Sequence, residues 1–257
     1  SRTSVFYTVA EHGFTILLAS YGYDQKREYA NLRKLLEHRV DGVVLTGLEH
    51  DEAIFQLIDS QNIPSVLMWN YAETSRYPSI GADNALAGKL IAEHILSLGH
   101  RDIAYMFPPT TGNDRAEGRR SSVIKTLNAA GVIVPEHWQL TTVYSISTSK
   151  RDTQDLLKAA QKPTAIICGN DILATGALYG ATAAGLSVPN DISIAGIGDF
   201  KGSSDIEPAL TTVRLPAKRI GQNAAIALAN AIVKPDEIVT GTHCEPELII
   251  RGSCAKI

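Results

Sequence analysis

The sequence lacks the long apolar runs and the one-sided charge that mark membrane proteins and nucleic-acid-binding chains. Its apolar stretches, such as 43–45 and 166–168, are far shorter than the roughly 20 residues of a membrane-spanning helix. The 24 basic and 27 acidic residues give a net charge of −3, and no block of five like charges occurs. We therefore expect no membrane partner, and no basic face for nucleic acid within this chain.

Cysteine is scarce as well. The three cysteines, Cys168, Cys244 and Cys254, form no CxxC pair. An odd number without paired spacing argues against a disulfide framework and favours a reducing compartment. These features predict a cytoplasmic protein.

The motifs of common enzyme classes are also missing. The sequence has no GxxxxGK[ST] loop for nucleotide phosphates, no GxGxxG after a strand, no GxSxG nucleophile turn and no HExxH metal motif. Its seven histidines are scattered, and no pair has the spacing of metal ligands. We therefore predict that the chain is not an enzyme and binds no cofactor or metal.

What is present is an alternation of strand-like and helix-like runs, which is typical of a parallel sheet with helices on both faces. The predicted strands are 14–20, 42–47, 65–69, 80–82, 102–107, 139–144, 164–169 and 192–198. The predicted helices are 24–38, 84–98, 115–130, 171–184 and 217–233. The strands fall into two groups, which predicts two α/β lobes. The most broken stretch, 107–113, is the expected crossing between them.

The start of the chain departs from this pattern. Residues 4–11 read as the end of a helix that stops at Gly13, and no strand precedes them. Doubly wound lobes usually open with a strand, and a lobe without it would expose a sheet edge or leave a gap. We therefore expect that the first lobe lacks its first strand in this sequence, and that upstream residues complete it.

Five residues lie at or just beyond the ends of predicted strands, at the edge where open α/β sheets bind ligands. They are Asp83, Arg115, Tyr144, Asn170 and Asp199. Carboxylates and amides bind pairs of hydroxyl groups, an aromatic ring covers the C–H face of a sugar, and arginine forks onto hydroxyls or a carboxylate. This mixture predicts a site for a polyhydroxylated small molecule.

Most of these residues also have a structural explanation. Asp83 and its counterpart Asp171 stand where helix N-caps belong. Asn170 and Asp199 suit turns, and Tyr144 suits packing at the rim of the core. Both interpretations stay open at this point, and the coincidence of several such residues at strand ends is the stronger argument for a site.

A series of short strings carries a more specific signal. In chain order they are Arg39-Val-Asp-Gly-Val-Val-Leu45, Asn62-Ile-Pro-Ser-Val66, Ala82-Asp-Asn84, Leu98-Gly-His-Arg-Asp-Ile-Ala104, Arg115-Ala-Glu-Gly118, Pro163-Thr-Ala-Ile-Ile-Cys-Gly-Asn-Asp171, Val188-Pro-Asn-Asp-Ile-Ser-Ile-Ala-Gly196, Pro208-Ala-Leu-Thr-Thr-Val213 and Arg251-Gly-Ser253. Each string is weak alone. Their order and spacing over nearly the whole chain closely resemble the effector-binding domain of LacI/GalR-family bacterial transcription regulators.

The resemblance implies a periplasmic-binding-protein-like fold, with two doubly wound parallel-sheet lobes joined by three crossovers. Residues 1–107 and 210–236 would form the first lobe, and residues 108–209 and 237–257 the second. It also implies a homodimer that binds operator DNA through an N-terminal helix-turn-helix, which this chain would lack. A small-molecule effector bound between the lobes would shift the operator affinity of that dimer.

The resemblance extends to most of the candidate site residues. Asp83 matches the family's acidic ligand contact, and Arg115 its sugar-hydroxyl or carboxylate contact. Tyr144 falls at the aromatic platform, and Asn170 matches the polar contact from the second lobe.

The last contact departs from the family pattern. Gly198 stands where an acidic residue is usual, so that either Asp199 substitutes from one position later or this contact is lost. The string Gly196-Ile-Gly-Asp-Phe200 is similar to the gluconate-type branch, which makes a sugar acid a candidate effector. We predict a sensor of a small sugar or sugar acid in a transcriptional regulator; the alternative is a periplasmic sugar-binding protein of a transporter.

Overall fold

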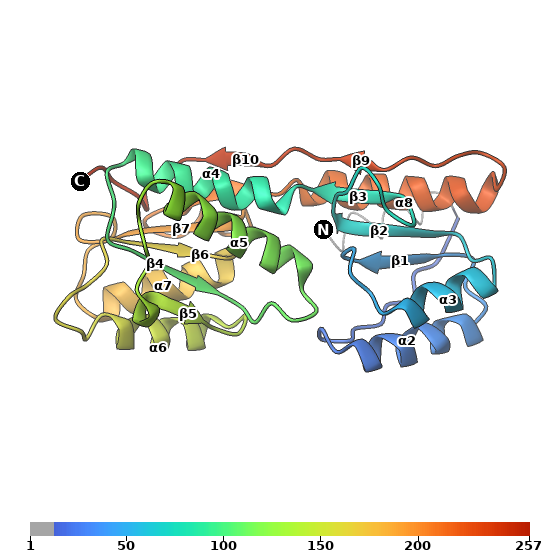
Figure 1. Cartoon of the computed structure of the whole chain (residues 1–257), viewed down its shortest axis with the longest axis horizontal. Coiled ribbons are helices and arrows are strands. Elements are labelled where there is room, and N and C mark those ends of the chain that lie inside the picture. Colours follow the sequence, from blue (N-terminus) through green and yellow to red (C-terminus); the bar gives the residue numbers. More distant parts are fainter. Residues whose placement is uncertain (1–12) are drawn as a thin grey trace. The chain divides into compact units, whose positions relative to one another are not determined.

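The computed structural model describes residues 13–257 and divides into two units, each of which is treated by itself (Figure 1). The units consist of residues 13–83, 111–115 and 216–245, and of residues 84–110, 116–215 and 246–257. The helix predicted over residues 4–11 lies outside the described residues. No helix within the described range is long and apolar enough to cross a membrane.

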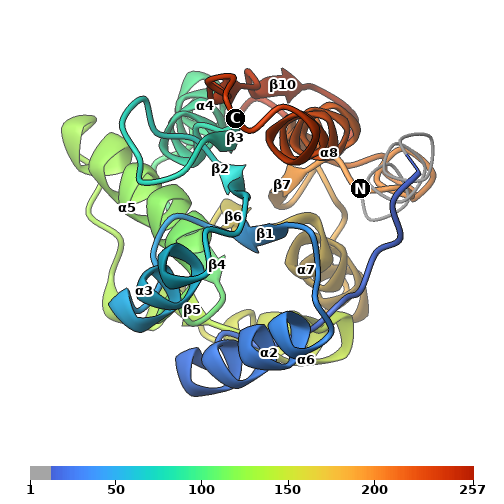
Figure 2. The same ribbon diagram turned by 90° about the vertical axis from the view of Figure 1, so that its right-hand side faces the viewer.

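In the described residues, a four-stranded parallel sheet forms the centre of the first unit. Its strands, in spatial order, are β1 (Val43–Thr46), β2 (Ser65–Asn70), β3 (Ser79–Ala82) and β9 (Thr242–His243). The accompanying helices are α2 (Gln25–Glu37), α3 (Glu52–Ser60) and α8 (Ala217–Val233). Figure 2 shows α3 and α8 on opposite faces of this sheet. The sheet is therefore covered on both sides, which explains the nearly continuous apolar runs of its strands.

The second unit is built on a six-stranded sheet, and all of its residues are described. The spatial order is β10 (Glu247–Ile249), β8 (Thr211–Arg214), β7 (Ser193–Gly198), β6 (Ala165–Cys168), β4 (Ile103–Phe107) and β5 (Gln139–Thr141). Only β10 runs antiparallel to its neighbour. The helices are α4 (Asn84–Ser97), α5 (Asp114–Ala129), the short 3-10 turn η1 (Glu136–Trp138), α6 (Ile146–Leu156) and α7 (Asp171–Ala183). In Figure 1, α4 and α5 lie on one face of the sheet, and α6 and α7 lie on the other.

The ends of the predicted helices are well matched. Helix α8 has the predicted bounds, and α2 begins after Asp24, whose carboxylate accepts from the amides of Lys26 (2.9 Å) and Arg27 (3.3 Å). Gly99, which follows α4, has φ +100°. Glycine adopts this left-handed conformation without the steric penalty of a Cβ, so it ends the helix where predicted.

The strand predicted over residues 14–20 is wrong. This segment is not a strand in the described part of the chain, and with β1 and α2 it lines a cavity of about 630 Å³. Leu17 and Leu18 are 50% and 61% exposed. A strand needs a hydrogen-bonding neighbour, and the cavity separates this segment from the nearest candidate, β1. The apolar pattern could not show that this neighbour is out of reach.

Helices α3 and α6 were not predicted. The surface that α6 turns towards α7 carries Ser149 and Thr153, and both side chains are buried. A Cβ at Gly176 would lie 2.5 Å from Ser149 Oγ, and one at Gly180 would lie 2.6 Å from Thr153 Cβ. Small polar residues packed on glycines leave no apolar periodicity, so the sequence pattern did not reveal this helix pair.

The units have other boundaries than the predicted lobes. Residues 84–107 belong to the second unit because β4 pairs with β5 and β6, and residues 210–215 belong there because β8 pairs with β7. Residues 237–245 belong to the first unit, where β9 pairs with β3. The alternation of strands and helices does not encode which sheet a strand joins. Only the strand pairing of the folded chain decides this.

Candidate functional site

Arg115, one of the predicted contacts, lies against the end of β1 in the first unit. Its Nη1 donates to the carbonyl oxygen of Thr46 at 3.1 Å and to Asp114 Oδ1 at 2.6 Å. The guanidinium carbon also lies 5.9 Å from the ring centroid of Tyr23. The Arg115 side chain is 10% exposed. This unit therefore holds the guanidinium in a defined position by its own contacts.

Asp114 is a residue that the sequence interpretation missed. Its Oδ2 accepts from the Leu48 amide at 2.8 Å and from Asn70 Nδ2 at 3.1 Å. Leu48 follows β1 and Asn70 ends β2, so one carboxylate ties together the ends of two neighbouring strands. The position of Asp114 in the first turn of α5 could be recognised in the sequence, but it predicts only a favourable interaction with the helix dipole and not these hydrogen bonds.

Asp83 follows β3 at the carboxyl edge of the same sheet and is partly buried. This edge contains an unusual backbone conformation, since Trp69 in β2 has φ +84°. Gly81 pairs with Trp69, and a Cβ there would lie 2.4–2.5 Å from backbone atoms of Asn70. β2 thus approaches β3 so closely that only glycine fits at position 81.

In the second unit, Asn170 connects β6 to α7. Its Oδ1 accepts from the Leu173 amide at 3.0 Å, which makes it the N-cap of α7. The alternative that Asp171 caps this helix is therefore wrong, because Asp171 is the first helical residue. The capping function of Asn170 is compatible with a ligand contact, since its side-chain amide nitrogen is a separate group.

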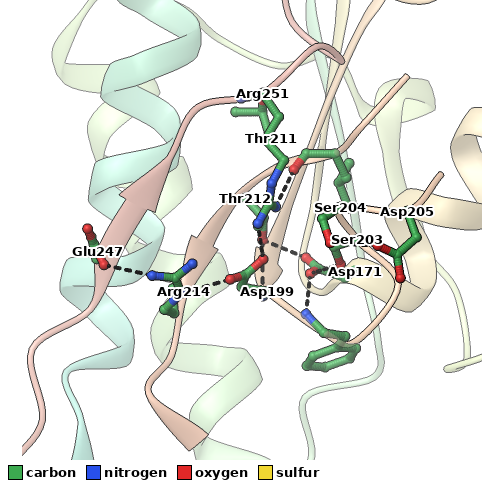
Figure 3. A network of polar contacts seen from close by, with 12 residues as sticks. Asp171, Asp199, Ser203, Ser204, Asp205, Thr211, Thr212, Arg214, Glu247 and Arg251 are labelled. Atoms are coloured by element: carbon green, nitrogen blue, oxygen red, sulfur yellow. Dashed lines mark hydrogen bonds and ion pairs between the residues drawn. The ribbon is translucent and has the colours of Figure 1, made fainter. Parts of the chain in front are cut away.

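Asp171 is instead a buried centre of hydrogen bonds, and it is 2% exposed. Its Oδ1 accepts from Thr212 Oγ1 at 2.6 Å, and its Oδ2 accepts from Ser203 Oγ at 2.7 Å and from the Phe200 amide at 2.9 Å (Figure 3). Burial raises the pKa of Asp171, and these hydrogen bonds act in the opposite direction. The carboxylate therefore joins α7 to β8 and to the loop after β7.

Asp199, at the end of β7, is paired with two arginines. Its Oδ2 accepts from Arg214 Nε at 2.7 Å, and its Oδ1 accepts from Arg251 Nη2 at 2.6 Å. Arg214 also pairs with Glu247 at 3.2 Å, so the chain of ion pairs includes β8 and β10 (Figure 3). A ligand hydroxyl at Asp199 would share the carboxylate with these guanidinium groups. The string Arg251-Gly-Ser253 is part of the resemblance to the family, but it does not predict the ion pair between Arg251 and Asp199.

We expect the stabilisation contributed by Asp199 to depend on pH. Burial acts to raise its pKa, but the hydrogen bonds from Arg251 and Arg214 outweigh burial and hold the pKa below its usual value. A carboxylate with a lowered pKa stabilises the fold above its unfolded-state pKa of about 4. That contribution is lost as the pH falls through the folded-state pKa.

The measurement is urea unfolding of the wild type and of Asp199→Asn at several pH values. The difference in unfolding free energy should shrink as the pH falls from about 5 through the unfolded-state pKa of about 4 and then through the lower folded-state pKa. A difference that stays constant over this range would show that the charge of Asp199 does not stabilise the fold.

The remaining predicted contact, Tyr144, lies three residues beyond β5 and is partly buried. Within the second unit, Asp171 links Asn170 and Asp199. Asp171 follows Asn170 in the sequence, and its carboxylate accepts from the amide of Phe200, in the loop that carries Asp199. The other two predicted contacts belong to the first unit; they are Asp83 and Arg115. Within residues 13–257, no group of three or more His, Cys, Asp or Glu side chains could hold a metal ion.

Comparison with known proteins supports a single family. The model of a periplasmic binding protein-like domain matches residues 92–254. The HTH-type transcriptional repressor PurR of Erwinia tasmaniensis is 32% identical over 245 residues, which cover 95% of this chain and 72% of that protein. The corresponding PurR of Klebsiella pneumoniae is 31% identical over 248 residues, with 95% and 72% coverage.

Solved structures agree with these relatives. The transcription regulator GntR from Chromobacterium violaceum superposes with a TM-score of 0.89 at 29% identity, covering 98% of this chain and 92% of that one. A LacI family regulator from Mycobacterium smegmatis superposes with a TM-score of 0.79 at 29% identity, covering 99% and 93%. Sequence similarity over nearly the whole chain and the shared α/β fold lead to the same conclusion. The chain belongs to the LacI/PurR-type transcriptional regulators and forms their periplasmic-binding-protein-like, effector-binding domain.

Proposed function

We propose that the effector of this domain is a small sugar or sugar acid, and that its binding shifts the operator affinity of a homodimer. The PurR relatives are named transcriptional repressors, which favours this function over that of a transporter's sugar-binding protein. In the complete regulator, operator DNA would bind to an N-terminal helix-turn-helix, and the protein would act in the cytoplasm.

One observation carries the choice of ligand class: in each unit by itself, side chains suited to a sugar lie at or just beyond the carboxyl ends of parallel strands. The first unit contributes Asp83 and the fixed guanidinium of Arg115, and the second contributes Tyr144, Asn170 and Asp199. Two carboxylates and an amide suit hydroxyl groups, and the ring of Tyr144 suits the C–H face of a sugar. We assign ligand contact to these five residues.

Arg115 favours a sugar acid over a neutral sugar. A guanidinium forms its strongest hydrogen bonds with a carboxylate, and this one is already held in place by Asp114 and Thr46. The Arg115 side chain would therefore lose little conformational entropy when it binds a ligand carboxylate.

A thermal-shift screen tests the proposal with gluconate, glucose, ribose and hypoxanthine as probes. A ligand at a hundredfold excess over its Kd stabilises the folded state by about 2.7 kcal/mol, which a melting curve detects easily. We expect gluconate to raise the Tm. In Arg115→Lys the apparent Kd should rise about tenfold because the planar fork is lost. Arg33→Lys, an exposed exchange on α2, is the matched control and should respond like the wild type.

The possible results separate the parts of the proposal. Stabilisation by glucose or ribose alone would keep the sugar sensor and discard the sugar acid. Stabilisation by hypoxanthine alone would overturn the sugar assignment and indicate a purine effector. No stabilisation by any probe would contradict the proposed ligand class altogether.

A further inference from the structure

The buried carboxylate of Asp171 has a function that helix capping does not explain. Its three donors are neutral, and all of them come from the chain that follows β7: the Phe200 amide, Ser203 Oγ and Thr212 Oγ1. A 2%-exposed carboxylate is costly to bury, and hydrogen bonds must compensate for its lost hydration. The burial of the Asp171 carboxylate therefore requires the backbone after β7 to place these three donors around it, and the hydrogen bonds stabilise that backbone conformation.

The loop after β7 has an unusual backbone at the residue that carries the predicted ligand contact. Asp199 has φ +51°, and Gly198 before it has φ +139°. A left-handed conformation at a residue other than glycine costs free energy and persists only when its surroundings enforce it. The hydrogen bonds of Asp171 to the loop contribute to that enforcement, together with the ion pairs that Asp199 forms with Arg214 and Arg251.

Both amides that flank the Asp199 side chain are bound in this way. The Phe200 amide donates to Asp171 Oδ2 at 2.9 Å, and the Asp199 amide faces Thr212 Oγ1 at 3.4 Å. The same Thr212 hydroxyl donates to Asp171 Oδ1 at 2.6 Å. Figure 3 shows the carboxylates of Asp171 and Asp199 on either side of Thr212. Asp171 thus holds the Phe200 peptide group directly and the Asp199 peptide group through Thr212, while Arg214 and Arg251 hold the Asp199 carboxylate itself.

Asp171 also packs closely against the neighbouring strand β7. A Cβ at Gly196 in β7 would lie 2.4 Å from Asp171 Oδ1. The carboxylate is therefore packed against the backbone of β7, two residues before the loop begins. This close packing on β7 restricts the carboxylate, which favours the loop conformation that supplies its hydrogen bonds.

We propose that Asp171 is a positioning residue of the effector site, which acts on ligand affinity through Asp199. Its hydrogen bonds hold the backbone of the loop that carries Asp199, so that the Asp199 carboxylate, shared with Arg214 and Arg251, accepts from ligand hydroxyls at the carboxyl end of β7. The effect of Asp171 on ligand affinity rests on the proposed function, whereas its effect on the conformation of the loop does not.

The first experiment needs no ligand. Amide hydrogen exchange is measured for the wild type, for Asp171→Asn and for Asp155→Asn, a control at an exposed carboxylate on α6. We expect the amides of residues 199–203 to exchange at least about tenfold faster in Asp171→Asn, with little change in β4 and β6. Unchanged loop exchange, or equal acceleration throughout the second unit, would overturn the positioning function.

A second pair of variants separates hydrogen bonding from packing. Thr212→Ser keeps the hydroxyl that Asp171 accepts from, and Thr212→Val keeps the shape but removes the hydroxyl. We expect fast loop exchange in Thr212→Val and nearly wild-type exchange in Thr212→Ser. The opposite order would show that packing, and not the hydrogen bond to Asp171, holds the loop.

The second experiment is a double-mutant cycle with the probe that gives the largest shift in the thermal screen. Asp171→Asn should weaken binding about tenfold in the wild type, and it should have little further effect in Asp199→Asn. Additive losses would overturn the action through Asp199. If no probe binds, the proposed ligand class fails, and the exchange experiment still decides whether Asp171 positions the loop.

Discussion

Replacing Asp114 by alanine is expected to lower the free energy of unfolding of the first unit by about 3–5 kcal/mol, the cost of breaking a buried ion pair from one side. Asp114 and Arg115 side chains are 8% and 10% exposed. Without the carboxylate, the guanidinium loses its charged partner, and the Leu48 amide and the Asn70 side chain lose their acceptor. The measurement is urea unfolding, followed by exchange of the amides at the end of β1.

Two variants show where this loss comes from. Asp114→Asn keeps an acceptor oxygen but not the charge, so its loss should be smaller than that of Asp114→Ala. Asp155→Ala removes an exposed carboxylate that pairs with Lys158 and should leave stability nearly unchanged. If Asp114→Ala behaved like Asp155→Ala, the polar network at this sheet edge would contribute nothing to the fold.

Gly81→Ala is the second change for which we expect a large effect. The new Cβ would lie 2.4–2.5 Å from backbone atoms of Asn70, which cannot rotate away as a side chain can. β2 and β3 would have to separate at their carboxyl ends, at a cost of about 3 kcal/mol or more in unfolding free energy. Since Asp83 follows β3 directly, ligand-induced stabilisation should fall as well. Both quantities are measured by thermal unfolding with and without the effector.

Gly118→Ala is the matched control. Gly118 lies within α5, and its Cβ would meet its nearest neighbour, Asn84 Cβ, at an ordinary 3.6 Å. Alanine reduces the conformational entropy of the unfolded chain relative to glycine, so this exchange should stabilise by about 0.4–1 kcal/mol. Equal effects of the two exchanges would contradict the close approach of β2 and β3.

The regular part of the fold could be predicted because its signals are local. Seven of the eight predicted strands and all five predicted helices that lie in the described residues overlap elements of the structure. Apolar runs and the glycine at position 99 act over a few residues, and they can be recognised in the sequence. The segment over residues 14–20 is the exception, because its apolar pattern required a neighbour that β1 does not supply.

The candidate site could be predicted only in part. Position at a strand end is a local property, so Asp83, Arg115, Asn170 and Asp199 could be selected from the sequence. Whether they contact a ligand stays a prediction. Their partners could not be selected, because Asp199 meets Arg251 across 52 residues of sequence.

The sequence by itself determined the class of fold, the helix ends and the family, because these depend on local patterns and on the order of short strings along the chain. Only the tertiary structure decided which sheet each strand joins, and which polar groups are buried together. It assigned β4 and β8 to the second unit, and it made Asp114 and Asp171 centres of hydrogen bonds. The physical reason is that strand pairing and the burial of a carboxylate depend on groups distant in sequence, which come together only when the chain has folded.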